Sequence, residues 1–223
     1  MREYIVESTT VNYKWTFDLM LPSLPGPGTP AFAKLARELH PYGISPAAVS
    51  VDAPTSRLGD VTLTILLLNN RVTLTITSST IELVVRGLLK GDDPSLIAIG
   101  DSVFSAVMEL EPTANKGSAQ IRMSSHLKLA PNNLAEILAE HLAPRKHGLL
   151  PETIVNRVML PEGMTSSTEL RLILAKSLAF PDSLFFDLTA DYKQMEWTAQ
   201  IAEWVNNDFE KVAELIGLQE RSS

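Results

Sequence analysis

Apolar and polar residues alternate most regularly between positions 61 and 77. The apolar positions are Val61, Leu63, Ile65 and Leu67, followed after Asn69 and Asn70 by Val72, Leu74 and Ile76. A period of two is typical of a strand that buries one face, and asparagine tolerates the positive φ angles of a hairpin turn. The pattern therefore predicts a β-hairpin with one aliphatic face. The other face is rich in threonine, and two interpretations stay open: the solvated side of an antiparallel sheet, or a platform that binds a ligand.

Apolar residues spaced three and four positions apart predict four helices. Their ends follow from capping, because Thr, Asp and Asn suit the N-cap, proline suits the first turn, and glycine ends a helix. The expected helices run from Thr29–Pro30 to Gly43, from Asp93–Pro94 to Leu110, from a cap at Asn132–Asn133 to Leu142, and from about Lys193 to Ile216.

The remaining regular segments predict strands at Val11–Leu21, 46–54, 119–129, 153–161, 168–177 and 183–192, while 79–89 fits a strand or a helix. Residues 1–113 and 114–223 each follow the order strand, helix, three strands, long helix. We therefore expect an α+β fold of mainly antiparallel sheets with two long helices packed on them, built from two duplicated halves packed as one compact unit. This element order resembles the TATA-binding-protein-like and helix-grip folds. The resemblance implies a fold class in which helix-grip members often hold apolar ligands between sheet and helix.

Composition and charge narrow the functional classes. The chain has 223 residues, 45% of them apolar, which is enough for one large or two small cores. The longest aliphatic run, Ile65–Leu68, is far shorter than the roughly 18 residues of a membrane helix. The first residues lack the pattern of a signal peptide, so we expect a cytoplasmic protein. The absence of cysteine excludes disulfides and thiolate metal sites.

The net charge of −7 is spread over the whole chain. Residues 1–113 hold 8 basic and 12 acidic residues, a balance of −4, and residues 114–223 hold 11 and 14, a balance of −3. Binding to nucleic acid depends on clustered lysine and arginine that neutralise phosphates. Neither half offers such a surface, so we expect no nucleic-acid partner.

Residues Gly100–Val103 read Gly-Asp-Ser-Val, which resembles the nucleophile block of the GDSL serine hydrolases. The resemblance implies a nucleophile at Ser102 and an Asp-x-x-His motif late in the chain. That motif is missing: the last histidine is His147, and Pro144 stands three residues before it. Since a serine nucleophile needs a base and a group that orients the base, the hydrolase is the least favoured hypothesis. The apolar stripe instead predicts a helix through Ser102, in which Gly100 permits the close approach of a neighbouring element.

The carboxylates and histidines of the chain form few patterns typical of a metal-binding or acid–base site. Asp187, Asp191 and Glu169 are expected on one sheet face, where they could hold a hard cation or serve as solvated charge. The four histidines, whose spacing matches no zinc motif, are His40, His126, His141 and His147. No phosphate-binding loop is present. We therefore predict no metal and no cofactor.

The preferred hypothesis is a non-enzymatic cytoplasmic binding or protein-interaction module, which forms a homodimer or another oligomer and binds no membrane. A long uncharged strand such as 71–77 is an aggregation hazard at a sheet edge, and pairing within the protein or across a dimer removes it. The alternative is a small-molecule-binding protein with an apolar pocket between sheet and long helix. Candidate ligand contacts on the last helix are Trp197, Trp204 and Phe209, since tryptophan is favoured at interfaces.

Overall fold

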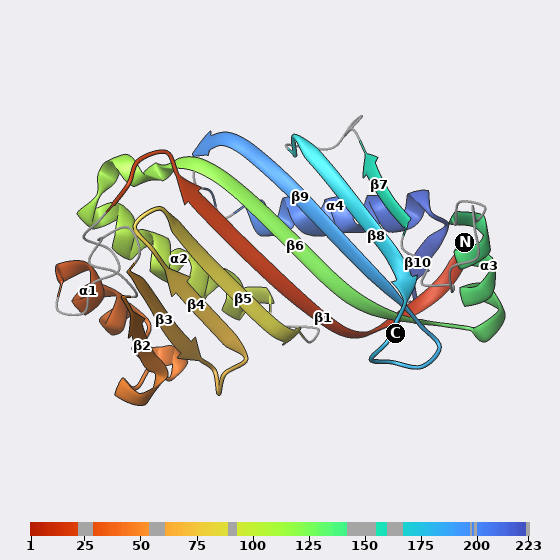
Figure 1. Ribbon diagram of the computed structural model, residues 1–223, viewed down its shortest axis with the longest axis horizontal. Helices are drawn as coiled ribbons and strands as arrows, with labels where there is room; N and C mark the ends of the chain where they lie inside the picture. The colour runs from red at the N-terminus through yellow and green to blue at the C-terminus, as the bar shows by residue number, and fades with distance from the viewer. Residues whose placement is uncertain are drawn as a thin grey trace. The chain divides into compact units, whose positions relative to one another are not determined.

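The computed structural model describes residues 1–21, 29–53, 61–88, 93–141, 155–159, 167–196, 198 and 200–221. Within these residues the chain is an α+β protein with a large antiparallel sheet and four α-helices (Figure 1). The strands are β1 (Arg2–Phe17), β2 (Val49–Asp52), β3 (Thr62–Leu67), β4 (Val72–Ile76), β5 (Thr80–Leu88), β6 (Lys116–Leu129), β7 (Val155–Met159), β8 (Glu169–Lys176), β9 (Ser183–Glu196) and β10 (Leu218–Glu220). The helices are α1 (Pro30–Glu38), α2 (Asp93–Leu110), α3 (Pro131–His141) and α4 (Ile201–Leu215).

Two compact units share the chain, and strands β1, β6 and β9 contribute residues to both. Unit 1 comprises Met1–Thr10, Arg122–Asp191 and Ala202–Ser223, and unit 2 comprises Val11–Ile121 and Tyr192–Ile201. The strand order is β2-β3-β4-β5-β1-β6 in unit 2 and β1-β6-β9-β8-β7 in unit 1, where β10 also pairs parallel with β1. The units are defined by contacts and not by sequence order, so the expected halves 1–113 and 114–223 and their duplication stay a prediction.

The predicted hairpin forms strands β3 and β4 of unit 2. Its inward side chains are all buried: Leu63, Ile65, Leu67, Val72, Leu74 and Ile76. The register pairs Ile65 with Leu74, and the turn residues Leu68, Asn69 and Asn70 all adopt positive φ angles. The hairpin prediction is therefore confirmed.

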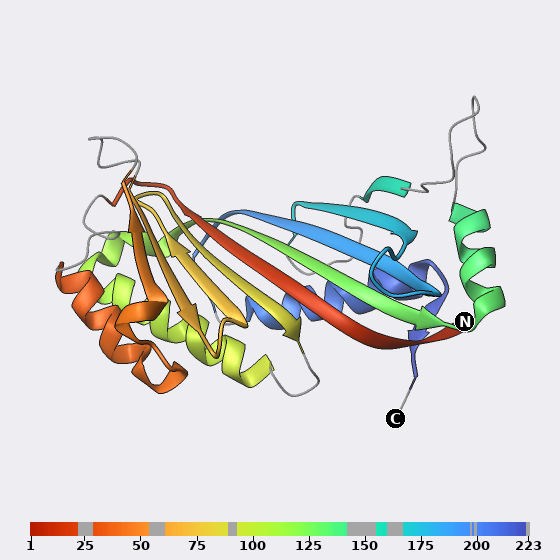
Figure 2. The same cartoon turned by 60° about the horizontal axis from the view of Figure 1, so that its bottom comes forward.

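Figure 2 shows α1 and α2 on the same face of strands β2 to β5 in unit 2. Thr29 caps α1 by accepting the Phe32 amide at 3.2 Å, as predicted. On α2, Phe104 packs edge-on against Trp15 of β1, with ring centroids 5.8 Å apart. Trp15 is fully buried, so this aromatic contact lies at the centre of the unit 2 core.

Glycine permits a close approach in unit 2, but at a different position from the one predicted. A Cβ atom built on Gly100 would meet no atom of the described residues within 4 Å, so the close approach expected there is not found among them. A Cβ on Gly117 of β6 would collide with the carbonyl oxygen of Thr16 and lie 3.0 Å from the Trp15 ring. Only glycine lets β6 come this near to β1.

In unit 1, α4 lies on one face of strands β6, β9 and β8 (Figure 2). Phe209 of α4 packs against Phe186 of β9, with ring centroids 4.7 Å apart. The other side chains of β9 on this face are also buried: Leu184, Leu188 and Ala190. This face is therefore the apolar core of unit 1.

Several boundaries differ from the sequence predictions. The first helix ends at Glu38, and Gly43, which was expected to end it, instead ends a short 3-10 helix, His40–Tyr42. β1 begins at Arg2 instead of Val11, because most side chains of its first half are half-buried and give no clear period of two. The strand lies between β5 and β6 in the sheet, and Arg2–Tyr4 also pair with β10. β9 continues to Glu196, where the pattern predicts a helix from Lys193, since an apolar stripe marks a helix face better than its start. The third predicted helix begins at Pro131 instead of after an Asn cap, because proline suits its first position. The ambiguous segment 79–89 forms strand β5.

Among the described residues, no helix combines the length and apolarity needed to cross a bilayer.

Candidate functional site

The two faces of the unit 1 sheet differ in chemistry. α4 covers one face, and side chains alternate between the faces along each strand. The opposite face, which we call the polar face, carries Arg122, Ser124, His126 and Lys128 of β6, Ser183, Asp187 and Asp191 of β9, and Glu169 and Arg171 of β8. Together with the turn between β8 and β9, this face forms the candidate site.

Asp187 is the most deeply buried charge of the polar face, with 1% of its surface exposed. Arg122 donates to both of its carboxylate oxygens, from Nε at 2.9 and 3.0 Å and from Nη2 at 2.7 Å. Ser124 Oγ donates to Asp187 Oδ1 at 2.8 Å. The hydrogen bonds to Asp187 raise the pKa of Arg122, whose side chain stays 53% exposed. The bidentate pair offsets the cost of burying the carboxylate and joins β6 to β9.

The other two predicted carboxylates share an arginine. Arg171 Nη2 lies 3.1 Å from Asp191 Oδ2, and Arg171 Nε lies 3.4 Å from Glu169 Oε1. Glu169 and Asp191 are also directly opposite each other in the β8–β9 register. Each predicted carboxylate therefore has an arginine partner. Within the described residues, no group of three acidic or histidine side chains is placed to hold a metal ion.

The turn Ser177–Ser183, whose last residue begins β9, connects β8 to β9 (Figure 1). Ser177 Oγ accepts the backbone amides of Ala179 at 3.2 Å and Phe180 at 2.9 Å. The same oxygen lies 2.9 Å from Nδ1 of His126. The Ser177 amide closes the turn by donating to the carbonyl of Ser183 at 2.8 Å. One serine hydroxyl thus fixes the turn and ties it to β6.

His126 is half-buried and contacts two aromatic rings. The ring centroid of His126 lies 4.8 Å from that of Phe180 and 5.4 Å from that of Phe185. Burial lowers the pKa of His126 below its ordinary value of 6.5, and the nearby carboxylate of Glu7 opposes this with a smaller effect. His126 is therefore neutral at pH 7 and acts in the turn as a hydrogen-bonding group.

The turn also contacts β1 through a carboxylate. Ser183 Oγ is fully buried and donates to Glu7 Oε2 at 2.6 Å. Lys128 Nζ lies 3.8 Å from Glu7 Oε1. Asp182, in the turn, is exposed and adopts a φ of +62°, a conformation that aspartate tolerates better than most residues. Both charge signs therefore surround the turn.

The turn presents a large apolar side chain, Leu178, to solvent. Leu178 is 97% exposed, whereas Phe180 in the same turn and Phe185 of β9 are half-buried. We call Ser177–Ser183 the docking turn. It combines a rigid backbone with an apolar tip.

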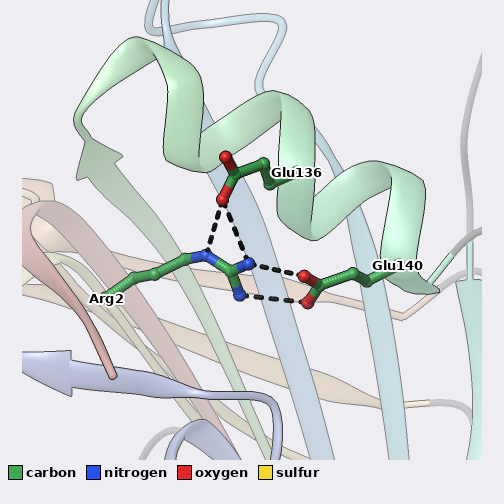
Figure 3. Close-up of polar contacts among 3 residues, drawn as sticks. All are labelled: Arg2, Glu136 and Glu140. Atoms are coloured by element: carbon green, nitrogen blue, oxygen red, sulfur yellow. Dashed lines mark hydrogen bonds and ion pairs between the residues drawn. The ribbon is translucent and has the colours of Figure 1, made fainter.

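A second polar cluster joins β1 to α3 at the start of the chain. Arg2 donates to Glu136 at 3.2 and 3.4 Å and to Glu140 at 2.5 and 3.0 Å (Figure 3). The hydrogen bonds from Arg2 lower the pKa of Glu140. The two glutamates are four residues apart and so lie on the same face of α3. The cluster attaches α3 to the strand, and both carboxylates are engaged by the protein's own cation.

Where the structure describes them, the aromatic candidates lie on α4 and not on the polar face. Phe209 is buried against Phe186, and Trp204 is half-buried on α4. Trp197 lies outside the described residues, as does His147. The role of Trp197, Trp204 and Phe209 as ligand contacts stays a prediction. Ser102 lies inside α2, so the helix interpretation of that motif is confirmed.

Sequence reasoning missed the partners that build the polar face. Arg122 and Asp187 are 65 residues apart, and His126 and Ser177 are 51 apart. The only available signal is the alternation of polar side chains along β6, which marks a face but no partner.

No protein-family model matches this chain, and no curated protein sequence matches it. The interpretation of the site therefore rests on its own geometry.

Proposed function

We propose that the chain is a non-enzymatic interaction module whose docking turn binds a second copy of the same chain. One observation carries this proposal: Leu178 is 97% exposed on a turn held by three hydrogen bonds to a single hydroxyl. A single exposed leucine is common on protein surfaces. Leu178 differs because its backbone is already ordered, so that little conformational entropy is lost on binding.

The charges around the docking turn favour a second copy as the partner. A two-fold interface brings the same surface patch of both subunits together. Lys128 supplies a positive charge to this patch, and Glu7 and Asp182 supply negative charges. Because the patch carries both signs of charge, two copies of it can meet with opposite charges facing each other. The chain as a whole carries a charge of −7, which opposes association elsewhere.

The chemistry of the polar face supports a binding role over a catalytic one. Both oxygens of Asp187 accept hydrogen bonds from Arg122, and Ser124 donates to the same carboxylate. A serine nucleophile instead needs a base that accepts its proton. His126, the histidine of this face, is hydrogen-bonded to Ser177, whose oxygen already serves two backbone amides.

Some finer sequence predictions are compatible with this proposal and independent of it. They are the TATA-binding-protein-like or helix-grip-like element order, the internal duplication, the cytoplasmic location, and the apolar ligand pocket between sheet and long helix.

Sedimentation velocity over a wide concentration range tests the proposal. We expect the wild-type chain, of 24.5 kDa, to form a dimer and the Leu178→Ser variant to remain monomeric. Leu215→Ser is the matched control, because Leu215 is also exposed, at 64%, but lies at the end of α4. This control should dimerise like the wild type.

Two outcomes would overturn the proposal. A wild-type chain that stays monomeric at all concentrations would exclude self-association. A dimer that survives Leu178→Ser unchanged, or that Leu215→Ser weakens as much, would place the interface away from the docking turn.

A further inference from the structure

The hydrogen bonds of Ser177 determine which nitrogen of His126 carries the proton. A hydroxyl oxygen has two lone pairs and one hydrogen. The amides of Ala179 and Phe180 occupy the lone pairs of Ser177 Oγ, so the hydroxyl hydrogen remains for His126. His126 Nδ1, 2.9 Å away, must therefore accept this hydrogen, and the proton of the neutral ring sits on Nε2.

A protonated histidine cannot keep this arrangement. Both ring nitrogens of a histidinium are donors, so Nδ1 would direct a hydrogen at an oxygen whose lone pairs are already used. Ser177 would then have to give up at least one of the two amides that define the turn.

We propose that protonation of His126 releases the docking turn, so that mild acid withdraws Leu178 from its fixed position and weakens self-association. The effect on association rests on the proposed function. The release of the turn does not, because it follows from hydrogen bonds within one chain.

The charged groups near His126 do not outweigh the effects that favour its neutral form. On β1, Glu7 favours the histidinium but is engaged by Ser183 and lies 3.8 Å from Lys128. On β6, Lys128 and Arg122 share the face of His126, and on β9, Asp187 is paired with Arg122. In the turn itself, Asp182 is exposed to solvent. Burial outweighs Glu7, so the neutral ring is favoured in the folded protein.

The sign of the pH dependence follows from linkage. The folded protein holds the pKa of His126 below the ordinary value of 6.5, so the open or unfolded turn binds the proton more readily. The turn is fully stable above about pH 6.5 and loses stability as the pH falls from there toward the lowered pKa. Acid therefore opens the turn.

Nuclear magnetic resonance of the isotope-labelled full chain tests the proposal in two steps. At neutral pH, the ring carbon and nitrogen shifts should show the proton on Nε2 of His126. Between about pH 7.5 and about pH 5, the Ala179 and Phe180 amides should lose the exchange protection that they have at neutral pH, while amides of β6 keep theirs.

Two histidine variants separate this switch from general acid effects. His126→Gln cannot gain a proton, and its amide oxygen can accept the Ser177 hydroxyl, so protection of the turn should be the same at both pH values. His40→Gln, in unit 2, should behave like the wild type. A proton on Nδ1 at neutral pH, or equal protection of the wild-type turn at both pH values, would overturn the proposal.

The same titration in Leu178→Ser separates the two proposals, because that variant should be monomeric with its turn intact. Loss of protection there, in a protein whose wild type never dimerises, would retain the switch and reject the docking function. A dimer whose turn keeps its protection in acid would retain the docking function and reject the switch.

Discussion

Units 1 and 2 are both built from strands covered on one face by helices, but different interactions hold them. Unit 2 has an apolar core in which Trp15 and Phe104 pack closely and Gly117 lets β6 approach β1. Unit 1 adds a buried carboxylate, Asp187, paired with Arg122, and the buried hydroxyls of Thr9 and Ser125, which lie 2.9 Å apart. The distant polar pair of unit 2, Asn12 with Glu82, is only part-buried. The stability of unit 2 should therefore respond most to changes in side-chain volume. The stability of unit 1 should respond most to changes in charge and protonation.

The largest expected effect breaks the steric fit of unit 2. In Gly117→Ala, the new methyl group collides with the Thr16 carbonyl oxygen and the Trp15 ring, and the backbone must shift. Overpacking of this kind costs about 3 kcal/mol, measured as a lower free energy of unfolding in urea. Gly100→Ala is the matched control, since it has free space in a helix and should raise the free energy of unfolding by about 1 kcal/mol. A Gly117→Ala protein as stable as the wild type would contradict the close approach.

A middle-sized effect tests the charge pairs of unit 1. Asp187→Asn removes the carboxylate to which Arg122 donates hydrogen bonds. It should lower the free energy of unfolding by about 2 kcal/mol, because hydrogen bonds to a charged group are lost at a buried position. The half-exposed Arg122 can be rehydrated, which limits the loss. Glu169→Gln, at a more exposed pair with Arg171, should cost less than about 1 kcal/mol. Equal losses in urea unfolding would show that burial of the carboxylate does not matter.

The smallest effect concerns the Arg2 cluster. Because Arg2 lowers the pKa of Glu140, the cluster stabilises α3 above about pH 4.5, the ordinary glutamate value, and this contribution is lost as the pH falls through the lowered pKa. Arg2→Gln should speed amide exchange in α3 at pH 7 and remove this part of the pH dependence. Arg221→Gln, which removes an exposed contact with Glu3, should leave α3 exchange unchanged. Equal α3 exchange in the wild type and Arg2→Gln would exclude a stabilising role.

The same contrast explains how far the sequence could predict the structure. In unit 2, the β3–β4 hairpin and the Thr29 cap depend on neighbours within a few residues, and both predictions are confirmed. In unit 1, strands β6, β8 and β9 were also predictable from alternation. The partners of Asp187 and His126 were not, because they lie 65 and 51 residues away and no periodicity links them. The first half of β1 was missed for a similar reason, since its partners in the sheet include β6 and β10, which come much later in the chain.

The sharing of β1, β6 and β9 between the units limits how the chain can be divided. Unit 1 is built from three separate segments, 1–10, 122–191 and 202–223, and unit 2 is built from the two segments that separate them, 11–121 and 192–201. No single cut can therefore release a complete unit, and a truncation at either end removes part of unit 1. Expression of one half would leave strands without their partners and expose unpaired edges, which promotes aggregation. For protein engineering, neither unit should therefore be produced alone by truncating the chain.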